Sequence, residues 1–172
     1  MKLKDLKMKI ALIGMPTSGK STIAKLLNEK LQIPVIDIDS LLEKRFNSTL
    51  QDFIDSQGEK KFLEEENFEL LEIDYPESCI ISTGGSVVYA KKAMEYLKSI
   101  GVKFIYLSAS LETLEQRLSQ QRNMRGIVMN GCQSWHELLI DRDILYRYYA
   151  DYIIDTDSKD MTQIAHEVFS DN

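Results

Sequence analysis

The stretch Gly14-Met15-Pro16-Thr17-Ser18-Gly19-Lys20-Ser21 decides the fold, because it fits the spacing G-x-x-x-x-G-K-[ST] at every fixed position. An apolar run at residues 10–13 precedes it, and a helical pattern at residues 22–27 follows it. In that context the backbone N–H groups of the loop and of the helix N-terminus point at phosphate oxygens. We therefore expect the loop to bind a nucleoside triphosphate; the alternative is a plain glycine turn between a strand and a helix.

Two side chains at the end of this loop add to its chemistry. Lys20 supplies a positive charge that reaches the outer phosphates, and the Ser21 hydroxyl is placed to ligate Mg²⁺. The loop itself does not indicate which molecule receives the phosphate. The residues of this segment that we expect to bind the nucleotide are Gly14, Thr17, Ser18, Gly19, Lys20, Ser21 and Thr22.

Composition and charge indicate one globular domain and limit its partners. The 172 residues are enough for one domain with a substantial core, and 44% hydrophobic with 28% charged residues is ordinary for such a domain. A net charge of −6 argues against a general nucleic-acid binder. No apolar run reaches transmembrane length, and the charged N-terminus lacks the apolar core of a secretory signal. We expect a single domain over residues 1–172, monomeric and cytoplasmic, that binds neither nucleic acid nor membrane.

Short apolar runs alternate with helical patterns along the chain, which indicates a parallel sheet covered by helices on both faces. Ligands of such sheets bind beyond the carboxyl ends of the strands. The predicted strands are residues 9–14, 35–37, 79–82, 103–107 and 152–154. The predicted helices are residues 20–31, 41–46, 50–56, 59–73, 90–100, 111–121, 134–150 and 160–169.

Two segments interrupt the simple alternation of strand and helix. Residues 41–73 insert several helices between the second and third strands, and residues 123–133 form a polar stretch between two helices. Insertions of this kind commonly carry binding pockets and mobile lids. We expect an acceptor-binding insertion at about residues 40–74 and a lid at about residues 122–134.

Two aspartates follow the second predicted strand, and they suit phosphoryl transfer. Asp37 and Asp39 lie two residues apart, so a strand would place both on one face. Asp37 would support the metal ion, through water, and Asp39 would accept the proton of the acceptor hydroxyl. The alternative is that such an aspartate only caps a helix. Because Ser40 and Glu43 have the spacing of a capping box, we expect Ser40 to be the cap.

Glycines and arginines later in the chain complete the candidate site. Gly84 and Gly85 follow the third strand, where glycines let a ligand approach the backbone or simply form a tight turn. Arg125 lies in the predicted lid and could reach the γ-phosphate as charge develops there. Arg142 lies on the next helix and suits a substrate carboxylate, although a surface arginine is more often only solvated.

These motifs together resemble shikimate kinase over nearly the whole chain. Their order is the glycine loop at residues 14–22, Asp37 with Asp39, Gly58-Glu59-Lys60-Lys61-Phe62 followed by Glu66, Gly84-Gly85, Arg117, Arg125, Arg142-x-x-Leu145-Tyr146 and Ile154-Asp155-Thr156. The resemblance implies a three-layer αβα P-loop kinase fold, with a five-stranded parallel sheet in the order 2-3-1-4-5, acceptor-binding helices and a closing lid. It also implies ATP- and Mg²⁺-dependent phosphorylation of shikimate to 3-phosphoshikimate, in aromatic amino-acid biosynthesis.

The same resemblance implies roles for individual residues. Lys20, Asp39 and Arg125 would be catalytic, with Asp39 contacting the acceptor hydroxyls as the base. Ser21 and Asp37 would lie by the metal ion. Arg117 would lie near the adenine and Arg125 near the phosphates. The acceptor would be bound by Asp39, Gly84, Gly85 and Arg142, with Arg142 pairing with its carboxylate.

The chain departs from the family pattern at three places. Leu63 stands where the family has an arginine that shares the carboxylate with the one at Arg142, Ser86 replaces the third glycine of the substrate loop, and Gly126 replaces the usual proline. Losing one charged partner of a desolvated carboxylate costs about 2–5 kcal/mol. Two further interpretations therefore stay open: a kinase of the same fold for another small hydroxylated acceptor, and a nucleotide-binding regulator without catalysis.

Overall fold

A five-stranded parallel sheet forms the centre of the computed structural model, which describes residues 7–120 and 126–170. Its strand order is β2-β3-β1-β4-β5, which confirms the predicted topology. The register of the parallel pairs brings the carboxyl ends of β1, β2 and β3 to one edge, with Leu12 opposite Ser82 and Asp37 also opposite Ser82. The strands are β1 (Lys9–Ile13), β2 (Val35–Asp37), β3 (Cys79–Ser82), β4 (Lys103–Ser108) and β5 (Tyr152–Asp155).

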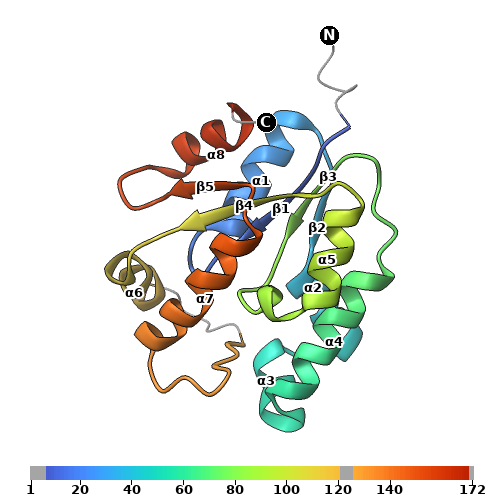
Figure 1. Cartoon of the computed structure of the whole chain (residues 1–172), viewed down its shortest axis with the longest axis vertical. Coiled ribbons are helices and arrows are strands. Elements are labelled where there is room, and N and C mark those ends of the chain that lie inside the picture. The colour runs from blue at the N-terminus through green and yellow to red at the C-terminus, as the bar shows by residue number, and fades with distance from the viewer. Residues whose placement is uncertain (1–6, 121–125, 171–172) are drawn as a thin grey trace.

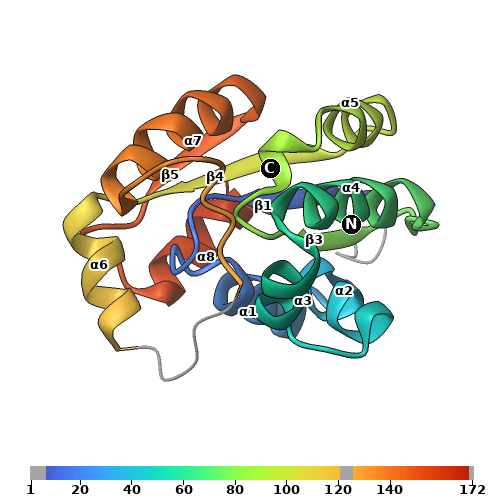
Figure 2. The same ribbon diagram turned by 90° about the horizontal axis from the view of Figure 1, so that it is seen from below.

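Helices cover both faces of the sheet, as Figures 1 and 2 show. Helices α1 and α8 pack together on one face, and α5 and α7 lie on the other, with α4 beside α5 (Figure 2). Helices α2 and α3 both contact α4, so the insertion forms one connected unit. The helices are α1 (Lys20–Leu31), α2 (Ile38–Phe46), α3 (Leu50–Gln57), α4 (Glu59–Glu72), the 3₁₀ helix η2 (Val87–Tyr89), α5 (Lys91–Ser99), α6 (Leu111–Ser119), α7 (Trp135–Tyr149) and α8 (Met161–Ser170).

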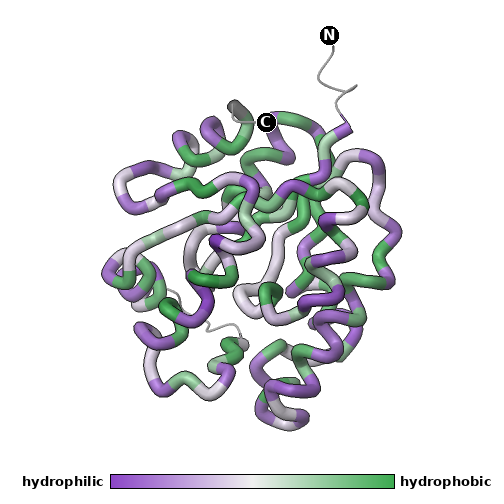
Figure 3. The backbone as a smooth tube through the Cα atoms, viewed as in Figure 1, coloured by the Kyte–Doolittle hydropathy of each residue, from purple (hydrophilic) through white to green (hydrophobic). Residues whose placement is uncertain are grey.

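The strands supply apolar side chains to both faces, as expected for a covered parallel sheet. In β1, Ala11 and Ile13 belong to the core on the α5 and α7 face, whereas Ile10 and Leu12 belong to the core under α1 and α8. All four are at most 1% exposed. Hydrophobic and hydrophilic residues alternate along α4 and α5 in Figure 3, which fits helices with one buried face. Within residues 7–120 and 126–170, no helix has the length and apolarity needed to cross a membrane.

Helix α2 begins earlier than the sequence pattern predicts. It starts at Ile38, and its N-cap is Asp37, whose carboxylate Oδ1 accepts a hydrogen bond from the Ser40 backbone N–H at 2.9 Å. The prediction that Ser40 is the N-cap is therefore wrong. The helix already begins at Ile38, so Ser40 lies inside its first turn, and the Asp37 carboxylate at the end of β2 is the capping group. Asp39 consequently projects from the first turn of a helix and not from a strand.

Candidate active site

The glycine loop connects β1 to α1 at the carboxyl edge of the sheet. Gly14 has φ +146°, and a Cβ atom there would lie 2.7 Å from the carbonyl oxygen of Leu107, so this position requires glycine. Ser18 is fully buried, and its backbone N–H donates a hydrogen bond to the Met15 carbonyl at 3.1 Å. The Thr17 hydroxyl donates to the Leu114 carbonyl at 3.1 Å, which ties the loop to α6. Hydrogen bonds within the loop and to α6 thus hold its conformation.

Lys20 lies across the mouth of this loop. Its Nζ donates hydrogen bonds to the carbonyl oxygens of Gly14 and Met15, both at 2.8 Å, and the residue is only 7% exposed. Gly19 and Lys20, together with the hydroxyls of Ser21 and Thr22 on the first turn of α1, line the same pocket. The N-terminus of α1, the cation and the hydroxyls form the arrangement that binds phosphate groups.

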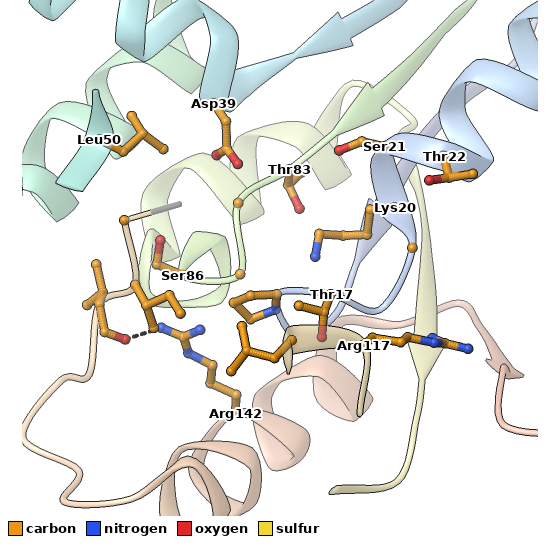
Figure 4. Close-up of a pocket in the computed structure, with 18 of the residues that line it drawn as sticks. Thr17, Lys20, Ser21, Thr22, Asp39, Leu50, Thr83, Ser86, Arg117 and Arg142 are labelled. Carbon is orange, nitrogen blue, oxygen red and sulfur yellow. Dashed lines mark hydrogen bonds between the residues drawn. The ribbon is translucent and has the colours of Figure 1, made fainter. Parts of the chain in front are cut away.

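A cavity of about 600 Å³ joins this loop to the acceptor-binding insertion. Figure 4 shows Asp39, Lys20, Thr83 and Arg142 around it, each from a different part of the fold. Gly14, Ser18 and Asp37 are not among the residues that line the cavity, and Arg125 lies outside the described residues. The predicted residues that line the cavity are Thr17, Gly19, Lys20, Ser21, Thr22, Asp39, Gly84, Gly85, Arg117 and Arg142.

Residues 83–86, which we call the acceptor loop, form one wall of the cavity. Three side-chain hydrogen bonds hold this loop: the Thr83 hydroxyl donates to the Leu12 carbonyl at 2.8 Å, the Tyr146 hydroxyl donates to the Gly85 carbonyl at 2.6 Å, and the Ser86 hydroxyl donates to Glu66 Oε2 at 2.8 Å. Strand β1, helix α7 and helix α4 therefore fix its backbone together.

The two glycines of the acceptor loop leave room for charged groups. A Cβ atom at Gly84 would lie 2.8 Å from Glu66 Oε1 and 2.9 Å from Asp39 Oδ1. A Cβ atom at Gly85 would lie 2.7 Å from the Pro16 side chain and 2.9 Å from an Arg142 guanidinium nitrogen. Any larger residue would therefore push aside either the carboxylates or the arginine.

Glu66 is a site residue to which the sequence analysis assigned no role, although it stands in the order of motifs that resembles the family. It is fully buried, and its Oε1 has no hydrogen-bond partner among residues 7–120 and 126–170. Burial, chiefly, and the nearby charge of Asp39 raise the pKa of Glu66 to about 7, although Ser86, Arg142 and Lys20 act in the opposite direction. A signal was present: Phe62, Glu66 and Leu70 are spaced by four, so they share the buried face of α4.

Arg142 carries a buried positive charge at the acceptor side of the cavity. It is 1% exposed, and one of its guanidinium nitrogens donates a hydrogen bond to the Val128 carbonyl (Figure 4). No carboxylate in the described part of the chain lies within ion-pair distance of it. A desolvated cation beside a polar cavity is suited to bind an anionic group of a ligand.

Arg117 lies at the opposite end of the cavity and is engaged with protein groups. Its guanidinium donates hydrogen bonds to the Ser18 carbonyl at 3.4 Å, the Thr156 hydroxyl at 3.2 Å and the Thr156 carbonyl at 3.0 Å. It therefore connects the glycine loop to the segment after β5.

The described part of the predicted lid is attached to the acceptor-binding insertion. The Glu59 carboxylate accepts hydrogen bonds from the backbone N–H groups of Met129 and Asn130 at 2.6 and 2.8 Å. Gly126 packs so closely on the start of α3 that a Cβ atom there would lie 2.7 Å from the Leu50 carbonyl carbon. Hydrogen bonds and close packing thus join residues 126–130 to α3 and α4.

Leu63 supplies no positive charge at the position where the family pattern has an arginine. It is half-buried, packs against the core and is not among the described residues that line the cavity. Arg142 is therefore the arginine that borders the acceptor end of the cavity within the described residues.

Ser21 and Asp37, the residues predicted for Mg²⁺, carry oxygen atoms of the kind that this ion prefers as ligands. Mg²⁺ needs only one or two protein oxygens when phosphates and water supply the rest. The Ser21 hydroxyl lines the cavity beside Lys20. Asp37, whose second carboxylate oxygen is not used by the helix cap, ends β2, which β3 separates from β1. Within the described ranges, no group of three or more His, Cys, Asp or Glu side chains is placed to hold a metal by itself.

Comparison with known proteins gives one family. The family model described as Shikimate kinase matches residues 16–171. A shikimate kinase of Streptococcus suis is 33% identical over 165 residues, which cover 94% of this chain and 98% of that protein. A shikimate kinase of Pseudomonas syringae pv. tomato is 31% identical over 162 residues, which cover 94% of each.

Solved structures agree with this result. The structure of shikimate kinase from Acinetobacter baumannii in complex with shikimate has a TM-score of 0.82 to this chain at 26% identity, covering 98% of this chain and 95% of that one. The shikimate kinase of Aquifex aeolicus has a TM-score of 0.77 at 27% identity, covering 95% of each. The chain belongs to the shikimate kinase family.

Proposed function

We propose that this protein transfers the γ-phosphoryl group of ATP to a ring hydroxyl of shikimate. The observation that carries the proposal is the single cavity in which the glycine loop, Asp39 and Arg142 meet. A phosphate-binding loop at one end and a buried cation at the other fit a nucleotide and a small anionic acceptor. Family membership and the shikimate complex of the Acinetobacter baumannii enzyme support this choice of acceptor.

On the donor side, the loop amides and Lys20 would hold the β- and γ-phosphates, and Arg117 would lie near the adenine. Ser21 directly, and Asp37 through water, would hold Mg²⁺, which when bound neutralises charge on the phosphates. Arg125 of the predicted lid would stabilise the charge that develops on the transferred group.

On the acceptor side, Arg142 would pair with the carboxylate of shikimate, while the backbone of Gly84 and Gly85 supports the ring. Asp39 would orient one hydroxyl and accept its proton. The hydroxyl oxygen then forms a bond to the γ-phosphorus as the bond from that phosphorus to the β–γ bridging oxygen breaks, which gives ADP and a phosphate ester. We further propose that the enzyme is a cytoplasmic monomer of aromatic amino-acid biosynthesis, on the basis of its family and composition.

A second candidate function is the phosphorylation of a different small hydroxylated metabolite. The observation that favours it is Leu63, because the cavity wall gains no second cation from that position. An acceptor without a carboxylate would not need a second cation in the cavity wall.

An assay of ADP release across shikimate, other polyols and hydroxy acids tests the proposal. We expect turnover with shikimate, and we expect Asp39→Asn to lose it. The control Asp74→Asn removes an exposed carboxylate outside the cavity and is expected to behave like the wild type. Turnover of another acceptor, with none above background for shikimate, would favour the second candidate. ATP binding without transfer to any acceptor would favour a regulator.

A further inference from the structure

The Arg142 side chain is held at both ends of its guanidinium group. On one side the Val128 carbonyl accepts a hydrogen bond, and on the other Nε donates to the Tyr89 hydroxyl at 3.4 Å. The guanidinium carbon also lies 5.3 Å from the centre of the Tyr89 ring, within the range of a cation–π interaction. These contacts leave the remaining guanidinium nitrogen beside Gly85, at the cavity wall (Figure 4).

Tyr89 is itself fixed in place. It ends the 3₁₀ helix that follows the acceptor loop, and its hydroxyl donates a hydrogen bond to the Asp141 carboxylate. Burial, together with this carboxylate, raises the pKa of Tyr89, so the hydroxyl keeps the proton that it donates. Asp141 precedes Arg142 on α7, and Tyr89 therefore connects α7 to the segment that carries the acceptor loop.

This arrangement has a consequence for carboxylate binding. An arginine has several rotatable bonds, and a ligand that must order them loses affinity. Leu63 lies outside the cavity lining, and Arg142 is the arginine that the described residues place at this end. A guanidinium already oriented toward the ligand would therefore favour carboxylate binding. We propose that Tyr89 is a positioning residue that orients the Arg142 guanidinium for the acceptor carboxylate and so determines the preference for an anionic acceptor. This inference rests on the proposed function.

The test compares two substitutions at Tyr89 with a matched control. Tyr89→Phe removes the hydroxyl and keeps the ring, and it is expected to raise the KM for shikimate about three- to tenfold with little change in kcat. Tyr89→Leu also removes the ring and is expected to raise that KM about tenfold or more. Tyr96→Phe changes a half-buried tyrosine of α5 that contacts Tyr75, away from the cavity, and is expected to match the wild type.

Two further readouts separate positioning from a general loss of structure. The KM for ATP is expected to stay the same in every variant. With the uncharged methyl ester of shikimate as acceptor, Tyr89→Phe and Tyr89→Leu are expected to match the wild type, because no carboxylate is there to be oriented. An unchanged shikimate KM in both variants, or an equal rise for the ester, would overturn the inference. Failure of the wild type to phosphorylate shikimate would instead contradict the proposed function.

Discussion

The two halves of the cavity are built in different ways. The proposed phosphate site of the donor half lies in one continuous segment, residues 14–22, which comprises a loop and the first turn of α1. The acceptor half is assembled from charged side chains on separate elements: the half-buried Asp39 on α2 and the buried Glu66 and Arg142 on α4 and α7. Its chemistry can therefore change by single substitutions, such as those at Leu63 and Ser86, while the donor half stays intact.

The largest effect is expected in the donor half. Lys20→Ala removes the cation at the phosphates, and kcat is expected to fall by about 10²–10³-fold, because charge on the transferred group loses its nearest compensating side chain. Steady-state rates of ADP release measure this fall. Lys98→Ala, on α5 and exposed, is the control. A rate for Lys20→Ala near that of the control would mean that the donor half has been misassigned.

In the acceptor half, Arg142→Ala is expected to raise the KM for shikimate about 30-fold or more, since a desolvated carboxylate loses its charged partner. The KM for ATP is expected to be unchanged, which serves as the internal control for folding. If the acceptor KM does not change either, another group binds the carboxylate.

Glu66 gives the acceptor half a pH dependence of stability. Because the folded protein raises its pKa from 4.5 to about 7, the protonated form is favoured on folding. The stabilisation is full below the unfolded pKa and is lost as the pH rises through the folded pKa. Relative to Glu66→Gln, the wild type is expected to lose about 2–3 kcal/mol of unfolding free energy between pH 5 and pH 8.

Urea denaturation of both proteins at the two pH values measures this difference. Glu64→Gln, which alters an exposed carboxylate on the same helix, is expected to keep the pH dependence of the wild type. Parallel pH profiles for the wild type and Glu66→Gln would show that Glu66 is ionised in the folded protein throughout this range.

The smallest expected effect concerns the departure at position 63. Leu63→Arg is expected to lower the KM for shikimate by about three- to tenfold, by adding a second cation for the carboxylate. Leu63→Met keeps the side chain apolar and serves as the control. A higher KM in Leu63→Arg would indicate that the new guanidinium pairs with Glu66, three residues further along α4, and not with the acceptor.

The difference between the halves also explains what can be predicted from the sequence. The prediction of the strands, their order and the phosphate loop is confirmed, because period and spacing are local signals. The cap of α2 is Asp37 and not the predicted Ser40. Both residue types can cap a helix, and Asp37 does so because α2 begins directly after β2 ends. The bond from Ser86 to Glu66 joins residues 20 positions apart, and that from Tyr146 to Gly85 joins residues 61 apart. No local pattern encodes such pairs.

A crystal structure of the protein with shikimate and ADP tests the central claim most directly. The account predicts shikimate in the cavity between the glycine loop and the acceptor loop, with its carboxylate on the Arg142 guanidinium and a ring hydroxyl within hydrogen-bond distance of Asp39. Shikimate bound with its carboxylate paired to other groups, or outside this cavity, would contradict it.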